Sequence, residues 1–354
     1  MTADQLYEAP PLAAPDVGRG YAAELLRRLG PGEPGFQARV GEALDEAEGL
    51  LRACTRDTAD PRVMALTGHL AATGGKRMRP LLVLLAAEFG DPYREGVARA
   101  AVVAELVHLA SLYHDDVVDR AATRHGAPTA NALWGNRQAV QGGDWLLARA
   151  ARLSADLVPE ALRLNALTAG RVIAGQTREL AGPVPGEDPV GHYFRVTAGK
   201  TAALLAMSLG VGAFQSGASP AVADALIEYG EQLGIAFQIA DDLLDLLSPE
   251  ASSGKQQGKD LLAGVDSLPV MLARAGTDPR DAELRELLAA GPAAGAGWHR
   301  RALDLFAVSQ ATIRTEAILY QRLALARSAL TSLPPLPARD ALDSLCDFVA
   351  RRTG

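Results

Sequence analysis

The chain has 354 residues, of which 48% are hydrophobic and 5% aromatic, and its formal net charge is −7. Ala and Leu dominate its apolar runs, a balance that favours helix over sheet. The negative charge argues against a general nucleic-acid-binding protein. Two cysteines, Cys54 and Cys346, provide neither a disulfide framework nor a zinc-ligand spacing, and they fit a reducing compartment.

Residues 1–35 are predicted to form a flexible N-terminal extension, because Pro and Ala are frequent and GPGEPG interrupts the chain at 30–35. Beyond it, segments with helical periodicity alternate with short breakers, and no run alternates like a half-buried strand. The predicted helices lie near 36–56, 61–73, 80–89, 97–119, 136–154, 158–181, 187–212, 219–247 and 266–275, with several more toward the end. We therefore expect one all-α domain over residues 36–354.

The N-terminal residues MTADQLYEAPPLAAPD lack the basic and apolar regions of a secretion signal. No uninterrupted apolar stretch approaches the roughly 18 residues of a membrane span. The sequence therefore predicts a cytoplasmic protein without a transmembrane segment.

Two copies of the pattern Asp-Asp-x-x-Asp are the most informative feature of the chain. Each follows a long apolar run that is predicted to be helical, so its first and third aspartates lie four residues apart on one helix face. The residues are Asp115, Asp116 and Asp119 in HDDVVD, and Asp241, Asp242 and Asp245 in ADDLLD. We expect all six carboxylates to point toward one place.

Carboxylates gathered in this way repel one another unless cations hold them. Ligand sets made only of oxygen suit hard divalent ions, and Mg²⁺ commonly uses one or two carboxylates, several waters and the phosphates of a substrate. The triplets therefore predict a Mg²⁺-dependent site for an anionic substrate, with a diphosphate as the first candidate.

Basic residues form three clusters that fit such a substrate. GGKRMRP at 74–80 places Lys76, Arg77 and Arg79 immediately before a helix opened by Pro80. The other clusters are Arg124-His125-Gly126 and Gly199-Lys200-Thr201. Arginine can hold phosphate with two hydrogen bonds, and helix N-termini favour anions.

Taken together, these motifs resemble the trans-isoprenyl diphosphate synthases, or polyprenyl synthetases. GGKRMRP, ELVHLASLYHDDVVD, RHGAPTAN, AGKTAAL, FQIADDLLD and GKQQGKD follow the order and approximate spacing of that family from about residue 40 onward. The resemblance implies the isoprenoid synthase fold, a large helical bundle around a deep cavity, usually in a homodimer. It also implies head-to-tail condensation of isopentenyl diphosphate with an allylic prenyl diphosphate.

The resemblance also implies residue roles. Both aspartate triplets would bind Mg²⁺, chiefly through Asp115, Asp119, Asp241 and Asp245. Gly75, Lys76, Arg79 and His108, with His125, would match the isopentenyl diphosphate site. The allylic side would be matched by Arg124, Lys200, Thr201, Gln238 and Lys255. The triplets together with Lys200 and Arg124 would promote departure of the diphosphate.

Two positions depart from the family pattern. His125 stands where a second arginine is usual, and histidine offers fewer hydrogen-bond donors to a phosphate. Leu262 stands where many members carry Arg or Lys. These departures leave two alternatives open, a class I terpene cyclase or lyase and a non-catalytic subunit of a heteromeric synthase. The intact Lys76, Arg79 and His108 argue against the first alternative, and the six aspartates argue against the second.

Product length is predicted from the helix that precedes the first triplet. Ser111, Val107 and Ala104 lie four, eight and eleven residues before Asp115 and share its face over about 16 Å. With Ala110 beside Ser111, no aromatic side chain stands where short-chain members of the family commonly place one. We therefore expect a product of twenty carbons or more.

Overall fold

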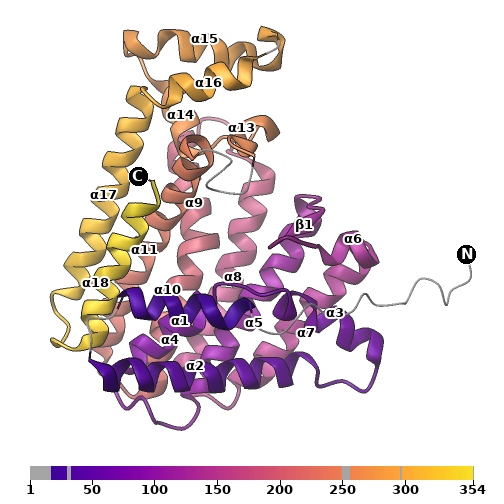
Figure 1. Ribbon diagram of the computed structural model, residues 1–354, viewed down its shortest axis with the longest axis vertical. Coiled ribbons are helices and arrows are strands. Elements are labelled where there is room, and N and C mark those ends of the chain that lie inside the picture. Colours follow the sequence, from indigo (N-terminus) through magenta and orange to yellow (C-terminus); the bar gives the residue numbers. More distant parts are fainter. Residues whose placement is uncertain (1–16, 30–32, 249–255, 296, 354) are drawn as a thin grey trace, which may run out of the picture. The chain divides into compact units, whose positions relative to one another are not determined.

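The computed structural model describes residues 17–29, 33–248, 256–295 and 297–353, and these residues are mainly helical (Figure 1). They include one small antiparallel sheet, in which β1 (Thr123–Arg124) pairs with β2 (Ala127–Pro128). The all-α class predicted from the sequence is confirmed.

Contacts within the chain define two compact units. The first comprises Met1–Val172, Leu204–Ile227 and Ser332–Ser344, and the second Ile173–Ala203, Glu228–Thr331 and Leu345–Gly354. The helices that lie wholly in the first unit are α1 (Val17–Leu29), α2 (Pro34–Thr55), α3 (Pro61–Ala72), α4 (Met78–Ala87), α5 (Val97–Val118), α6 (Ala130–Trp134) and α7 (Asn136–Ser154). Those with residues in both units are α8 (Pro159–Ala181), α10 (Ala203–Ser216), α11 (Pro220–Leu247) and α18 (Pro337–Ala350). This division into units does not test the prediction of one domain over 36–354, which stays a prediction.

Helix α5 is the central element of the first unit and packs against α2, α4 and α7. It is apolar over most of its surface, as expected of a helix surrounded by others. Two glycines of α7 allow a close approach. A Cβ at Gly142 would lie 3.2 Å from the Tyr113 ring, and one at Gly143 would overlap the ring of His114. The C-terminal part of α5, which carries the first aspartate triplet, is therefore held tightly by α7.

Helix α1 differs from the unstructured extension expected over residues 1–35. Residues 17–29 form a helix whose side chains Ala22, Leu25, Leu26 and Leu29 are buried. Helix α1 packs against α2 and α4, which cover its apolar side chains. The composition of residues 1–35 alone does not reveal these partners, because they lie later in the chain.

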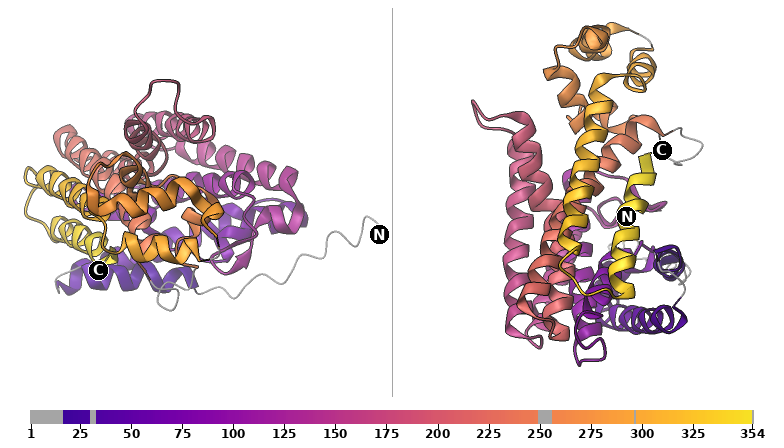
Figure 2. Two further views of the ribbon diagram at one scale, coloured as in Figure 1. Left: turned by 90° about the horizontal axis from the view of Figure 1, so that it is seen from above. Right: turned by 90° about the vertical axis from the view of Figure 1, so that its left-hand side faces the viewer.

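The second unit contains the remaining elements. They are α9 (Pro189–Thr197), the π-helix η2 (Ala198–Ala202), α13 (Lys259–Ala263), α14 (Leu268–Ala275), η3 (Pro279–Asp281), α15 (Ala282–Ala290), η4 (Gly291–Ala294), α16 (Trp298–Phe306), α17 (Gln310–Leu330) and η5 (Arg351–Thr353). Leu246, Val270, Leu284 and Phe306 belong to one buried apolar cluster, and α15 packs beside α16 (Figures 1 and 2). The core therefore extends from α11 to the paired helices.

Four helices begin with a side chain that caps their first turn. Asp60, Thr129, Asp188 and Ser309 each accept a hydrogen bond from a backbone N–H in the first turn of the helix that follows, α3, α6, α9 and α17 respectively. Such caps satisfy donors that a helix leaves unpaired at its N-terminus.

One helical stretch in the described part of the chain, 189–216, is long and apolar enough by composition to cross a membrane. In its most apolar window, 83% of the residues are buried inside the protein. Because core helices show the same pattern, the stretch is weak evidence for a membrane span.

Candidate active site

The first part of the site is the loop at 73–77, which joins α3 to α4, together with Arg79 in the first turn of α4. Gly74 has φ 93° and Arg77 has φ 47°, so the backbone turns through the left-handed region twice before α4 begins. Glycine adopts that region freely, whereas arginine does so rarely. Lys76 is exposed, with its Nζ 5.2 Å from the centroid of the Tyr21 ring. Arg79 is half-buried, and its Nε has no hydrogen-bond partner among the described residues.

The β1–β2 hairpin brings a second basic cluster to this loop. His125 (φ 50°) and Gly126 (φ 78°) occupy its two-residue turn, and positive φ at both positions is the requirement of a type I′ turn. A Cβ at Gly75 would lie 4.0 Å from Cε1 of His125 and 3.0 Å from Nη1 of Arg77. His125 therefore lies beside the glycine-rich loop, as the isopentenyl diphosphate assignment requires.

His108, on α5, lies among the cations of the first unit. Burial lowers the pKa of its imidazole well below the ordinary value, and the positive charges of Arg79, Arg124 and His125 lower it further. Its Nδ1 is buried and has no hydrogen-bond partner within the described structure. Burial likewise lowers the pKa of Arg79 to about 10. A crowd of positive charges around buried nitrogens that lack partners in the described structure favours an anion.

The first triplet ends α5 and divides its three carboxylates between two environments. Asp116 is buried and accepts a hydrogen bond from Nε of Arg124 at 2.7 Å. Burial raises the pKa of Asp116, and Arg124 opposes that rise. Asp115 is half-buried, and Asp119, at the C-terminal cap of α5, is exposed. The middle aspartate thus holds Arg124, while the outer two face more solvent.

The second triplet, which belongs to the second unit, also has a buried middle aspartate. Asp242 is buried and accepts hydrogen bonds from the Tyr193 hydroxyl (2.8 Å), Nε2 of Gln238 (3.1 Å) and the backbone N–H of Leu268 (3.1 Å). Burial raises its pKa to about 6, although the Leu268 N–H opposes the rise. The middle aspartate is again committed to the protein.

The outer aspartates of the second triplet have different partners. Asp241 pairs with Nη2 of Arg352 at 2.6 Å, and this guanidinium also stacks 4.4 Å from the centroid of the Phe237 ring. Asp245 accepts hydrogen bonds from the backbone N–H groups of Lys259 and Asp260. Burial and the nearby charge of Asp260 raise the pKa of Asp245.

The third basic cluster lies on the π-helix η2, whose wider turn presents Lys200 and Thr201. Nζ of Lys200 is 2.6 Å from Glu179, and the Thr201 hydroxyl donates to Gln238 at 3.0 Å. Gly234 meets η2 closely, since a Cβ there would overlap Ala202. Single π-turns inserted in α-helices frequently mark functional sites. Thr201, Gln238 and Asp242 are therefore linked by consecutive hydrogen bonds. The remaining residue predicted for the allylic side, Lys255, lies outside the described residues.

The predicted chain-length residues differ in accessibility. Ala104 and Ala110 expose no surface and Val107 exposes 4%, whereas Ser111 is half-buried and its hydroxyl donates to the carbonyl of His108 at 2.8 Å. Ser111 is thus the most accessible of the four positions. The other three are packed against neighbouring helices.

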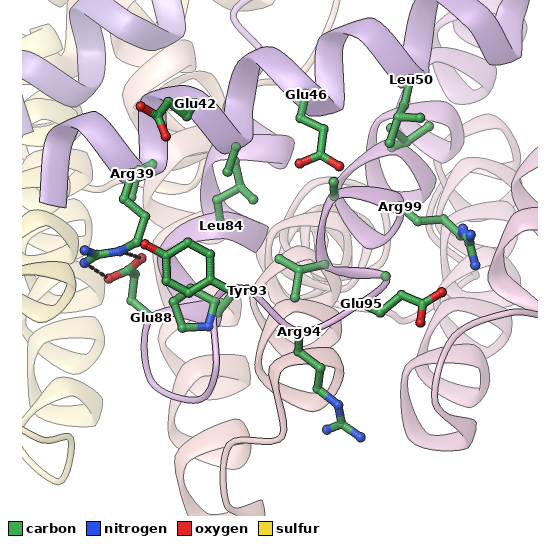
Figure 3. Close-up of a pocket in the computed structure, with 18 of the residues that line it drawn as sticks. Arg39, Glu42, Glu46, Leu50, Leu84, Glu88, Tyr93, Arg94, Glu95 and Arg99 are labelled. Carbon is green, nitrogen blue, oxygen red and sulfur yellow. Dashed lines mark hydrogen bonds and ion pairs between the residues drawn. The ribbon is translucent and has the colours of Figure 1, made fainter. Parts of the chain in front are cut away.

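A separate cavity of about 470 Å³ lies on another face of the first unit (Figure 3). Glu46 and Leu50 of α2, Leu84 of α4, and Arg99 and Val102 of α5 are among its lining residues. Arg99 and Val102 project from the side of α5 opposite to Ala104 and Ser111, at about 100° per residue. No predicted site residue lines this cavity, so it is distinct from the candidate active site.

Among the described residues, no three His, Cys, Asp or Glu side chains are grouped closely enough to hold a metal ion. Asp116 and Asp242 are buried against protein donors, whereas Asp241 and Asp245 are half-buried and pair with Arg352 and with two backbone N–H groups. The more accessible donors are therefore carboxylate oxygens of the outer aspartates. This set suits Mg²⁺, which retains waters and binds substrate phosphates besides one or two carboxylates.

Three residues of this arrangement were not predicted from the sequence. Tyr193 and Arg352 contact aspartates of the second triplet, and Glu179 contacts Lys200. For Arg352, the sequence offered one signal, the arginine pair at 351–352. Composition alone predicts that such a pair is exposed to solvent.

An all-α protein with two aspartate triplets and an incompletely neutralised cation cluster has the features of an enzyme that acts on diphosphates. The family model described as polyprenyl synthetase matches residues 60–300. The chain is 40% identical over 324 residues to nonaprenyl diphosphate synthase of Mycobacterium tuberculosis, covering 91% of this chain and 96% of that protein. It is 37% identical to heptaprenyl diphosphate synthase component 2 of Geobacillus stearothermophilus, covering 80% and 88% respectively.

Solved structures agree with these relatives. Geranylgeranyl pyrophosphate synthase from Corynebacterium glutamicum, complexed with calcium and isoprenyl diphosphate, matches with a TM-score of 0.82 and 38% identity, over 91% of this chain and 99% of that one. A decaprenyl diphosphate synthase from Rhodobacter capsulatus matches with a TM-score of 0.80 and 32% identity, over 91% and 99%.

The chain belongs to the polyprenyl synthetase family. The predicted isoprenoid synthase fold and the predicted enzyme class, trans-prenyl transfer rather than terpene cyclisation, are confirmed by these comparisons.

Proposed function

We propose that this enzyme condenses isopentenyl diphosphate head-to-tail with an allylic prenyl diphosphate, releasing pyrophosphate and a prenyl diphosphate of twenty carbons or more, and that it requires Mg²⁺. The cation cluster of the first unit carries the proposal. Arg79 and His108 each keep a buried nitrogen without a partner among the described residues, beside Arg124 and His125. A diphosphate would accept hydrogen bonds from Arg79 and the neighbouring cations, and Gly75 and Lys76 lie a few residues before Arg79 in the chain.

The outer aspartates are the proposed metal ligands. Asp115, Asp119, Asp241 and Asp245 flank the middle aspartates Asp116 and Asp242, which are buried and accept hydrogen bonds from Arg124 and Tyr193. Mg²⁺ bound there would neutralise the charge that develops on the departing diphosphate. The middle aspartates would serve instead to hold Arg124 and the Gln238–Thr201 chain in place.

The chain's own residues account for the other requirements of the reaction. The allylic C–O bond breaks, and C4 of isopentenyl diphosphate bonds to the allylic carbon. The cation that this leaves at C3 is discharged by loss of a proton from C2, for which the departing diphosphate is the available base. Lys200 and Arg124 are proposed to stabilise the leaving group electrostatically. The small apolar side chains of α5 keep water from the allylic cation, which water would otherwise capture.

A homodimer is the proposed assembly, and an apolar patch on α8 supports it. Ile173 and Leu180 are both exposed, at 61% and 64%. Their spacing of seven residues brings them to one side of the helix, about 10 Å apart. Exposed apolar surface of this kind suits a second copy of the chain. Sedimentation analysis of Ile173→Lys, expected to yield monomers, tests this assignment.

A cytoplasmic location also remains part of the proposal. Cys54 and Cys346 are both free thiols, as is usual in a reducing compartment.

Purified protein with isopentenyl diphosphate and each allylic primer provides the test of the activity. Mass analysis should find prenyl diphosphates that are five carbons longer per cycle. Lys76→Ala and Arg79→Ala should raise the KM for isopentenyl diphosphate more than the KM for the primer. A product without incorporated isopentenyl units, or an unchanged KM in both variants, would contradict the proposal.

A further inference from the structure

Arg77 belongs to the basic loop by sequence, but its guanidinium points into the protein. Only 4% of the residue is exposed. Nε donates to Glu48 at 2.8 Å, Nη1 to Glu105 at 3.2 Å, and Nη2 to the carbonyl of Ala71 at 2.6 Å and to Glu48 at 3.4 Å. All three nitrogens of the guanidinium therefore donate within the protein.

These bonds join three helices to the loop between Lys76 and Arg79. Glu48 comes from α2, Ala71 from the end of α3 and Glu105 from the middle of α5, while Arg77 itself is the N-cap of α4. Gly75 borders the same guanidinium, because a Cβ there would lie 3.0 Å from Nη1 of Arg77. The buried side chain of Arg77 thus fixes the path of the loop.

Stability alone gives little reason for this arrangement. Arg52 also donates to Glu48, at 3.1 Å, so two guanidiniums offset the two carboxylates. Buried ion pairs of this kind are often replaceable by apolar residues without loss of stability. A non-glycine residue at φ 47° adds backbone strain, which persists where the surroundings enforce it and is frequent at functional sites. Glu105 also keeps Oε2 buried without a partner within the described structure.

We propose that Arg77 is a positioning residue: the Glu48–Arg77–Glu105 ion triad fixes the left-handed turn at Arg77 and thereby directs Lys76 and Arg79 toward the diphosphate of isopentenyl diphosphate. The inference rests on the proposed function of Lys76 and Arg79. It gives Glu105 and Glu48 a role in substrate affinity although neither touches the substrate.

The consequence is a selective kinetic defect. If the triad is broken, the two phosphate-binding side chains lose their alignment while the allylic side keeps its own residues. A misplacement of about 1 Å can cost about 100-fold in rate, so we expect the KM for isopentenyl diphosphate to rise about 10- to 100-fold. The KM for the allylic primer should change by no more than about twofold.

The experiment compares Arg77→Met, Arg77→Lys and Glu105→Gln with a matched control, Arg39→Met. Arg39 also joins α2 to α4, through two bonds to Glu88 of 2.6 and 2.9 Å, but lies away from the basic loop. Arg77→Lys keeps the charge without the planar fork and should give an intermediate KM. Glu48→Gln, which removes one charge and keeps the side-chain shape, replaces Arg77→Met if that variant does not fold.

Steady-state kinetics with both substrates and thermal unfolding separate the outcomes. A rise in the KM for isopentenyl diphosphate in the triad variants, absent in Arg39→Met at equal loss of stability, supports the proposal. Triad variants that lose stability but keep that KM overturn it and make the triad purely structural. If Lys76→Ala and Arg79→Ala also leave that KM unchanged, the proposed substrate site itself is wrong.

Discussion

The substitution Ser111→Phe is expected to shorten the main product, because its ring would stand one helical turn from the first aspartate triplet. At about 1.5 Å per residue, Ser111 lies about 6 Å along the α5 axis from Asp115, whereas Ala104 lies about 16 Å away. A phenyl ring at Ser111 would therefore close about 10 Å of the face along which a growing chain would extend. We expect the main product to fall to fifteen carbons or fewer while the first condensation is retained.

The structure provides a neighbouring control. Ser111 is half-buried and loses one hydrogen bond to the His108 carbonyl when replaced, at a cost of about 1 kcal/mol. Ala110 exposes no surface, so Ala110→Phe must displace packed side chains. This overpacking should lower the free energy of unfolding by about 1–3 kcal/mol. Ser111→Phe should thus change the product with a small loss of stability, and Ala110→Phe should lose stability first.

Product chain length is measured by chromatography or mass spectrometry after incubation with labelled isopentenyl diphosphate and a short allylic primer. Denaturant unfolding gives the stability of each variant. Wild-type protein that already stops at fifteen carbons would refute the reasoning, as would Ser111→Phe protein that makes the wild-type product.

Three further results are expected. His125→Arg should lower the KM for isopentenyl diphosphate about tenfold, since a charged hydrogen bond contributes about 1.5 kcal/mol; an unchanged KM would remove His125 from the site. Arg352→Gln should lower the Mg²⁺ concentration for half-maximal activity about two- to fivefold by freeing Asp241, and a metal titration of activity shows whether it does. Burial depresses the pKa of His108 in the folded protein, so as the pH falls its imidazole is protonated more readily in the unfolded state. The free energy of unfolding should therefore fall as the pH drops below about 6.5. His108→Asn should weaken that pH dependence between pH 5 and 8.

The positions of the helices could be predicted because periodic apolar residues mark them directly. The predicted segments 97–119 and 136–154 correspond to α5 and α7 within one residue. The aspartate triplets and basic clusters were visible for the same reason, since each motif is local. What α1 buries could not be predicted, because its apolar partners belong to α2 and α4.

The division of work within each triplet could not be predicted either. All three aspartates of a motif look alike in sequence, and only the packing of Arg124 and Tyr193 distinguishes Asp116 and Asp242 from their neighbours. The π-turn at η2 likewise depends on Gly234, whose missing side chain admits Ala202. Contacts between residues far apart in the chain decide these features.

A metal-dependence assay on the two outer aspartates tests the central claim most directly. Turnover of isopentenyl diphosphate with an allylic primer is measured for wild type, Asp115→Asn and Asp241→Asn, each with Mg²⁺ and with excess chelator. Both triplets are proposed to stabilise the leaving diphosphate, so each substitution should reduce turnover about 10²- to 10³-fold without unfolding the protein, and chelator should abolish activity. Full turnover in chelator, or wild-type turnover in both variants, would contradict the account.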